Sequence, residues 1–83
     1  MTYTLTRHAA DVITRRAIQH EWIQRTLDAP ERIEFDRRDP VLVHHVKRIV
    51  EFNNRALRVI FNPSSVPRSV VTVYFDRNVK DLS

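Results

Sequence analysis

The sequence contains no cysteine, no glycine and no long run of apolar residues. Without cysteine, the chain can form neither a disulfide framework nor a thiolate metal site. Without glycine, the glycine-rich loops that hold phosphate groups in nucleotide-binding proteins are excluded. No stretch approaches the roughly 18 apolar residues of a membrane-spanning helix, and the N-terminus lacks an apolar signal core. These absences predict a cytoplasmic protein without a cofactor, stabilised by packing alone or with help from a partner.

The length sets the size of the fold. A chain of 83 residues is expected to form one domain over residues 1–83, because chains below about 100 residues seldom divide. Such a chain has enough apolar surface for one layer of helices on one sheet.

The charged residues are unevenly distributed. The chain holds 14 lysines and arginines against 10 acidic residues, a formal net charge of +4. Segment 28–39 contains five of the acids but only three of the bases. Twelve of the fourteen bases are arginine, whose planar guanidinium group binds phosphate bidentately and stacks on bases. This composition is typical of RNA-directed proteins and also of ordinary soluble surfaces, so charge alone leaves both interpretations open.

Two helices are predicted near the N-terminus, after a short β-prone segment at residues 3–5. The first runs from an N-cap at Thr6 to about Arg16, with apolar residues recurring at helical spacing. The second begins near Gln19 or His20 and ends before Pro30, because the residue preceding a proline avoids helical angles. Their expected buried stripes are Ala9, Val12 and Ile13 in the first helix, and Trp22, Ile23 and Leu27 in the second.

The rest of the chain is predicted to form strands. A short strand at 32–35 leads into a charged loop, and longer strands follow at 42–52, 55–62 and 69–76. The expected fold class is α+β in β-α-α-β-β-β order, with two N-terminal helices packed on one face of a twisted antiparallel sheet.

The pair Asn53-Asn54 is expected to form a type I′ turn, since asparagine is the commonest non-glycine residue at positive φ. A two-residue turn would pair Val50 with Leu57 and place Lys47 opposite Ile60. The face covered by Trp22 would then carry Val46, Val50, Leu57, Val59, Phe61, Val71 and Val73. The uncovered face would collect His45, Lys47, Arg58, Thr72, Tyr74 and Asp76.

This uncovered face is the predicted functional surface. His45 has the near-neutral pKa suited to general acid or base work. Arg58 could neutralise the charge that builds on a pentacovalent phosphate, and Tyr74 could stack on a base or donate its hydroxyl. The alternative is an ordinary solvated sheet face.

The other histidines give weaker signals. His8 lies on the first helix with Asp11 and Arg15, an arrangement that fits either a surface charge ladder or a role at the RNA site. No spacing among the four histidines suggests zinc, so no metal is expected.

Three parts of the chain carry a family resemblance. The first is Thr6-Arg7-His8-Ala9 with Arg16-Ala17-Ile18 and Glu21-Trp22-Ile23. The second is His44-His45-Val46-Lys47-Arg48-Ile49 with Arg55-Ala56-Leu57-Arg58-Val59-Ile60-Phe61, and the third is Val71-Thr72-Val73-Tyr74-Phe75-Asp76-Arg77. They resemble the uncharacterised bacterial family called domain of unknown function 4258. That family looks like a member of the RelE/ParE-like toxin fold, which includes BrnT. The resemblance implies helices followed by an antiparallel sheet, metal-independent endoribonuclease activity and a partner antitoxin.

Two residues depart from the family pattern. Val12 stands where many members have an arginine, and Ala17 stands where glycine is usual.

The leading hypothesis is therefore a RelE-like toxin-type module that cleaves RNA without metal. Its expected catalytic residues are His45, Arg58, Tyr74 and His8, and its expected RNA-binding residues are Lys47, Arg58, Arg77 and Arg16. The alternative is a non-catalytic protein-binding module, such as an enzyme-blocking toxin or an accessory subunit.

Overall fold

The structure is a computed structural model that describes residues 2–79. Its elements follow in the order β1 (Tyr3–Leu5), α1 (Arg7–Arg16), α2 (His20–Asp28), β2 (Arg32–Phe35), β3 (Val43–Ile49), β4 (Arg55–Asn62) and β5 (Arg68–Phe75). The expected α+β class is confirmed, and the four strands after the helices correspond to the four predicted segments, one more than the order β-α-α-β-β-β counts. Within the described residues, neither helix is long and apolar enough to cross a membrane.

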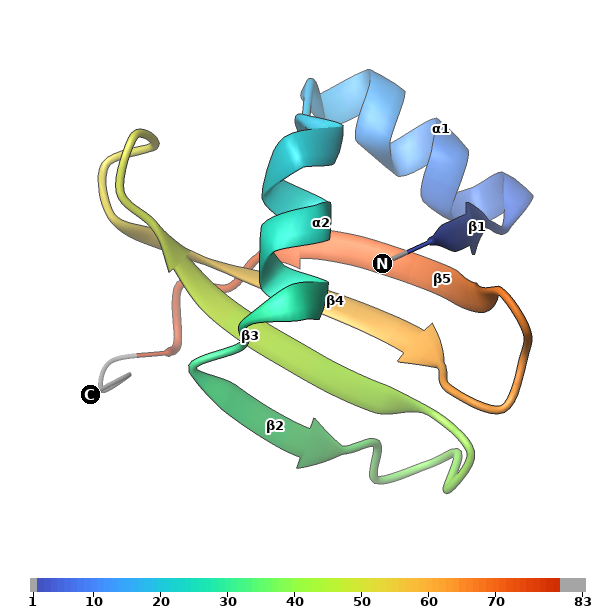
Figure 1. Ribbon diagram of the computed structural model, residues 1–83. Coiled ribbons are helices and arrows are strands. Elements are labelled where there is room, and N and C mark those ends of the chain that lie inside the picture. Colours follow the sequence, from blue (N-terminus) through green and yellow to red (C-terminus); the bar gives the residue numbers. More distant parts are fainter. Residues whose placement is uncertain (1, 80–83) are drawn as a thin grey trace.

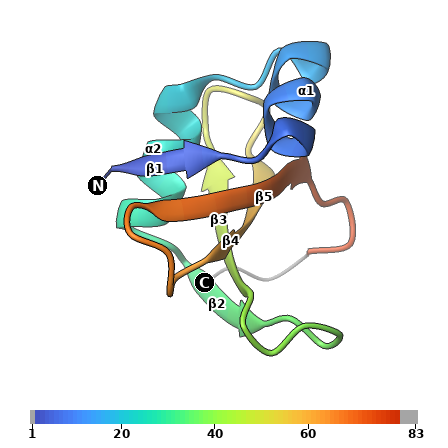
Figure 2. The ribbon, with the colours of Figure 1, turned by 90° about the vertical axis from the view of Figure 1, so that its right-hand side faces the viewer.

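The strands form one open sheet in the order β1-β5-β4-β3-β2. The last four strands in the sequence pair antiparallel with their neighbours, whereas β1 pairs parallel with β5. The N-terminal strand therefore lies at one edge, beside the C-terminal strand, and β2 lies at the other (Figures 1 and 2).

Both helices begin where the sequence predicts. The Thr6 hydroxyl accepts a hydrogen bond from the Ala9 amide at 3.1 Å, and donates one to the Val71 carbonyl at 3.2 Å, which ties α1 to β5. Gln19 is the N-cap of α2. Helix α1 ends at Ala17, whose φ of 54° is left-handed, and this conformation explains why glycine suits the position.

The core lies between the helices and one sheet face (Figure 1). Trp22, Ile23 and Leu27 of α2 are buried against Leu57, Val59 and Phe61 of β4, as predicted. Ala9 and Ile13 of α1 join the same cluster, and Val12 is also buried.

The predicted register of the central hairpin is wrong. Asn53 and Asn54 do have positive φ values of 53° and 59°, and the Arg55 amide donates to the Phe52 carbonyl at 3.1 Å, as in the expected turn. A second turn precedes it, in which the Phe52 amide donates to the Ile49 carbonyl. Residues 50–52 are thereby removed from the strand, and Leu57 pairs with Lys47 instead of Val50.

The shift of three residues turns β3 over, because an odd shift sends every side chain to the opposite face. His45 and Lys47 pair with Val59 and Leu57, on the helix side of the sheet. Val46 pairs with Arg58 on the uncovered face, and Val50 is 76% exposed in the loop. The predicted positions of Leu57, Val59, Phe61 and Val73 on the core side are correct, as are those of Arg58 and Tyr74 on the open face.

Candidate nucleic-acid interface

The predicted site residues do not meet at one point. His45 lies under α2, and its ring packs edge-on against Phe61 with centroids 4.7 Å apart. Burial lowers the pKa of His45, an effect reinforced by the charge of Arg68 and opposed by backbone groups of Thr26 and Leu27. A buried, neutral imidazole with an unpartnered Nδ1 fits a packing role better than acid–base work on a surface ligand.

Lys47 and His8 also lie away from Arg58. The Lys47 ammonium donates to the carbonyl of Ala29 at 2.9 Å, just after α2 ends, so it closes the C-terminus of that helix. His8 is exposed on α1, and its Nε2 lies 3.3 Å from the Thr72 hydroxyl.

Arg58 and Tyr74 do come together, on paired positions of β4 and β5. Arg58 is only 8% exposed. Its Nη1 donates to Glu34 at 2.8 Å, and its Nε donates to Asp76 at 2.9 Å. Two carboxylates therefore neutralise this guanidinium group before any ligand arrives.

A histidine that the sequence reasoning passed over completes this network. Arg58 Nη1 also lies 2.9 Å from Nδ1 of His44, whose Nε2 lies 2.7 Å from Asp36. Because the guanidinium group can only donate, Nδ1 of His44 accepts this hydrogen bond. Nε2 therefore carries the imidazole proton and donates a hydrogen bond to Asp36. Both imidazole nitrogens are therefore occupied.

The pKa values in the network follow from these contacts. The hydrogen bond from Arg58 lowers the pKa of Glu34, and the hydrogen bond with His44 lowers that of Asp36. Burial opposes the charge of Arg58, but its bonds to the two carboxylates outweigh that and raise its pKa. Burial also raises the pKa of Tyr74. At neutral pH the charged groups at the centre of the open face are thus paired with one another.

A different set of arginines gathers at the end of the sheet. Arg16 is in the last turn of α1, Arg55 begins β4, and Arg77 follows the end of β5. All three side chains are exposed, and none forms an ion pair within residues 2–79. We call these three residues the arginine cluster.

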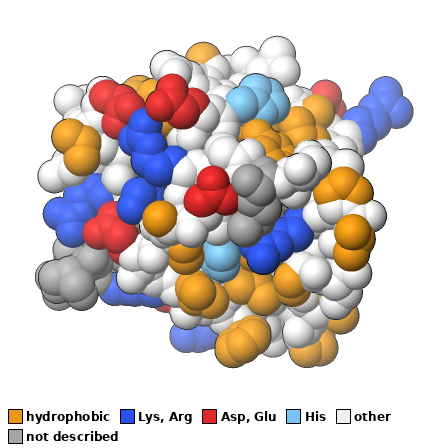
Figure 3. All heavy atoms as spheres, in the orientation of Figure 1, with side chains coloured by type: hydrophobic (Ala, Val, Ile, Leu, Met, Phe, Trp, Pro, Cys, Tyr) orange, Lys and Arg blue, Asp and Glu red, His pale blue; other side chains and the backbone are white. Residues whose placement is uncertain are grey.

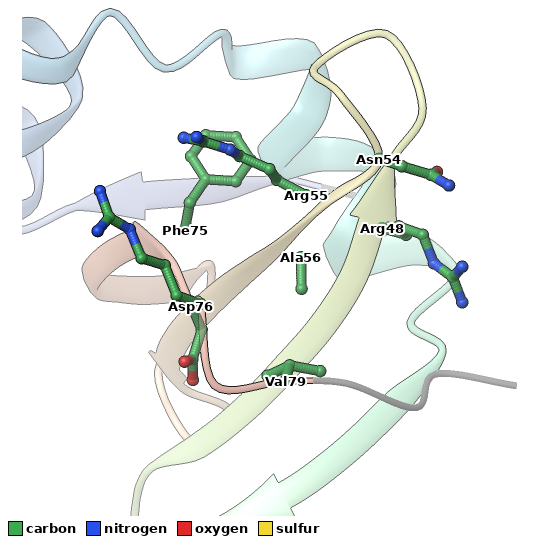
Figure 4. A pocket seen from close by; sticks show the side chains of 8 residues that line it. Arg48, Asn54, Arg55, Ala56, Phe75, Asp76 and Val79 are labelled. Atoms are coloured by element: carbon green, nitrogen blue, oxygen red, sulfur yellow. The ribbon is translucent and has the colours of Figure 1, made fainter.

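The arginine cluster borders two adjoining hollows that share Arg55, Phe75 and Arg77. The larger, of about 310 Å³, is lined by Arg48, Asn54, Arg55, Ala56, Phe75, Asp76, Arg77 and Val79 (Figure 4). Figure 4 shows Arg55 and Phe75 on one side of Ala56, with Arg48 on the other. The smaller, of about 180 Å³, adds Arg16, Ala17, Trp22 and Phe52.

Aromatic rings line these hollows. Phe52 and Phe75 stack with centroids 4.6 Å apart, and Trp22 lies 5.4 Å from Phe52. The Arg55 guanidinium group lies over the Phe52 ring, 5.5 Å from its centroid. Cations beside aromatic rings offer both phosphate pairing and base stacking, the two contacts that bind single-stranded nucleic acid.

The loop before Arg55 is fastened to α2. Arg25 holds Glu51 bidentately, with distances of 2.8 and 2.9 Å, and also bonds Glu21. The hydrogen bond from Arg25 lowers the pKa of Glu51 to about 2. This pair fixes the loop that carries Asn54 and leads into Arg55.

Sequence reasoning identified Arg16 and Arg77 but missed Arg55 and Arg48. A usable signal was present, because Arg55 begins one strand and Arg77 follows the end of its antiparallel neighbour, so both must lie at the same end of the sheet. Among the described residues, no group of three or more histidine and acidic side chains is placed to hold a metal ion.

Comparison with known proteins assigns the chain to a family. The model of the family described as "Domain of unknown function (DUF4258)" matches residues 5–75. No curated protein and no solved structure matches the chain. Because the match covers most of the sequence, the chain belongs to this family.

Proposed function

Starting from a family with no assigned activity, we propose that this chain is a cytoplasmic RNA-binding module whose contact surface is the arginine cluster. One observation carries the proposal. Arg55 and Arg77 line both hollows, Arg16 lines the smaller one, and none of the three forms an ion pair with an acidic side chain among residues 2–79. Surface cations without an acidic partner can pair with phosphates, and each pairing releases counterions condensed on the nucleic acid, which favours binding.

The rings beneath the arginine cluster favour a single strand over a duplex. Phe52 and Phe75 are half-buried at the margins of the hollows. A base can reach such a ring only when it is unpaired, as in single-stranded RNA.

The proposal is tested by measuring the affinity for a fluorescein-labelled single-stranded 12-nucleotide RNA at several salt concentrations. If three phosphates are contacted, the logarithm of the affinity should fall with that of salt at a slope of about −2, since each contact contributes about −0.7. The triple variant Arg16→Gln, Arg55→Gln, Arg77→Gln should bind at least about a hundredfold more weakly, because each charged hydrogen bond contributes about 1.5–3 kcal/mol.

A matched control removes the same charge elsewhere. Arg7, Arg37 and Arg38 are exposed and line neither hollow. Their triple glutamine variant should keep most of the affinity. Absence of binding by the wild type, or an equal loss in the control, would contradict the proposal.

The second candidate function is RNA cleavage by a toxin of the RelE/ParE-like fold, held in check by an antitoxin. The observed order of two helices followed by strands favours it, but fold analogy alone does not choose an activity. Neither hollow of the arginine cluster is lined by a histidine or tyrosine, so its geometry supports binding more directly than proton transfer.

Cleavage is tested by incubating labelled RNA with the protein in EDTA. A toxin should cut the RNA, and removing its acid or base by His8→Gln, His45→Gln or Tyr74→Phe should lower the rate about 10²–10⁴-fold. Intact RNA, bound with the salt dependence given above, would leave binding as the function. Absence of both binding and cleavage would favour a protein-binding module.

A further inference from the structure

The two edges of the sheet are protected differently. At β1, Tyr3 and Leu5 are half-buried against the core. At β2, Ile33 is 58% exposed and Phe35 is 76% exposed. Helix α2 packs over β3 and β4 (Figure 1), and in Figure 3, which views the helix side, hydrophobic side chains gather along the margin where β2 lies.

The backbone of β2 is also open on its outer side. The Asp36 amide donates to the Leu42 carbonyl, and hydrogen-bonding positions alternate along an antiparallel strand. Residues 32, 34 and 36 therefore bond inward to β3, whereas Ile33 and Phe35 direct their amide and carbonyl groups outward. The residues with free backbone groups are also those with exposed apolar side chains.

We propose that β2 is an interface with a second copy of this chain, formed by antiparallel pairing of the two β2 strands about Ile33. The inference does not rest on RNA binding, because β2 carries none of the arginine cluster.

Charge favours a second copy as the occupant. The chain has a net charge of +4, and two copies repel each other over most of their surface. Strand β2 lies in segment 28–39, which has five acids against three bases. Two copies therefore meet with least repulsion at this edge. The same excess of acidic residues makes the edge unsuited to binding a polyanion.

Charge also selects the register. A two-fold axis at Glu34 would set Arg32 opposite Asp36 of the second copy, but it would also set the two Glu34 carboxylates opposite each other on the axis. An axis at Phe35 would set Glu34 opposite Asp36 of the second copy. An axis at Ile33 sets no like charges opposite each other, and it sets Arg32, which lies 3.6 Å from Glu34 of its own strand, opposite Glu34 of the second copy, twice. Opposite charges on facing positions stabilise a strand pair, and like charges destabilise it.

The same register pairs the apolar side chains. Ile33 faces Ile33 of the second copy, and Phe35 lies diagonal to it, within reach of a large side chain. A strand of four residues buries less than the roughly 1,200 Å² of a stable complex. We therefore expect a weak, concentration-dependent dimer.

The absence of cysteine makes this inference directly testable. Facing Cα atoms on a hydrogen-bonded antiparallel pair are about 5.5 Å apart, within the range a disulfide spans. In the full chain under mild oxidation, Ile33→Cys should form a covalent dimer at least about tenfold faster than Val66→Cys, because pairing raises the effective thiol concentration. Val66 is a matched control, since it is 95% exposed in a loop.

Sedimentation velocity of the wild type over a range of concentrations gives the independent measurement. The wild type should shift toward the dimer as concentration rises, and Ile33→Lys, which sets two ammonium groups on the axis, should remain monomeric. Circular dichroism will show that the variant is folded. A wild type that stays monomeric, or equal crosslinking through Val66→Cys, would overturn the interface. Faster crosslinking through Phe35→Cys than through Ile33→Cys would overturn the pairing about Ile33.

Discussion

The centre of the open face and the end of the sheet both contain arginine, in two electrostatic states. Arg58 is buried and held by Glu34 and Asp76, with His44 against it. Arg55 and Arg77 are exposed, and within residues 2–79 neither forms an ion pair. The difference teaches that an arginine's partners decide its role. At the centre of the open face the arginine holds strands together, whereas at the end of the sheet the arginines keep a positive charge that a ligand can pair with.

The largest expected effect follows from opening the network at the centre of the open face. Arg58→Met keeps much of the side-chain volume but leaves Glu34 and Asp76 without their partner. Removing one member of a buried ion pair costs about 3–5 kcal/mol, and we expect about 3 kcal/mol here because Glu34 is partly exposed. Urea unfolding measures this loss.

The contrasting substitution is Arg77→Gln, which should change the free energy of unfolding by less than about 0.5 kcal/mol, as for a surface site without partners. Similar losses in Arg58→Met and Arg77→Gln would remove the distinction between the two regions.

A smaller effect is expected from His45, on the side of the sheet away from Arg58. Burial lowers its pKa, so the unfolded chain takes up a proton below about pH 6.5 while the folded chain resists. The free energy of unfolding should fall as pH drops below about 6.5, and level off below the folded pKa. His45→Phe should remove this dependence in urea melts between pH 5 and 8.

The carboxylates of the network act in a separate range. Glu34 and Asp36 have lowered pKa values, so the stability that they contribute is present above about pH 4 and is lost as pH falls through their folded pKa values.

The His45 prediction is contradicted if the free energy of unfolding of the wild type and of the His45→Phe variant changes with the same slope between pH 5 and 7.

Among the substitutions that remove a contact, Lys47→Met should have the smallest effect, because it removes one hydrogen bond, to the Ala29 carbonyl. The stem of the side chain is retained, so the loss should be about 0.5–1 kcal/mol, the net contribution of one hydrogen bond. RNA affinity should stay close to that of the wild type. A loss of affinity as large as that of Arg77→Gln would extend the proposed RNA-binding surface to the helix side of the sheet.

The helices were predictable because their signals are local. The Thr6 side chain caps α1, Gln19 occupies the N-cap position of α2 without a side-chain hydrogen bond, and Trp22, Ile23 and Leu27 recur at helical spacing. The register of β3 was not predictable in the same way, because it depends on a second turn at residues 49–52. Phe52 leaves the strand to pack against Trp22 and Phe75, a tertiary contact that overrides the alternation of the strand.

The alternation of apolar and polar residues along β3 did not indicate that the predicted register was wrong. Both faces of β3 mix apolar and polar residues, with Val46 on the open face and His45 and Lys47 toward the helix. Amphipathic side chains can cover apolar surface with their stems or rings, so alternation alone could not assign the faces. For the site, charge pointed to Arg16 and Arg77, but only the fold shows that Arg58 is neutralised.

The parallel pairing of β1 with β5 also bears on how the chain folds during synthesis. Tyr3 pairs with Arg68, and Thr6 bonds Val71, so the first strand and the last strand meet across nearly the whole sequence. Helix α1 packs mainly on β5 and only slightly on β1, so most of its apolar stripe stays exposed until β5 exists. Contacts between such distant segments slow folding. The native sheet can therefore assemble only after β5 has emerged from the ribosome, and until then α1 and the edge strand β2 expose apolar surface that a chaperone can bind.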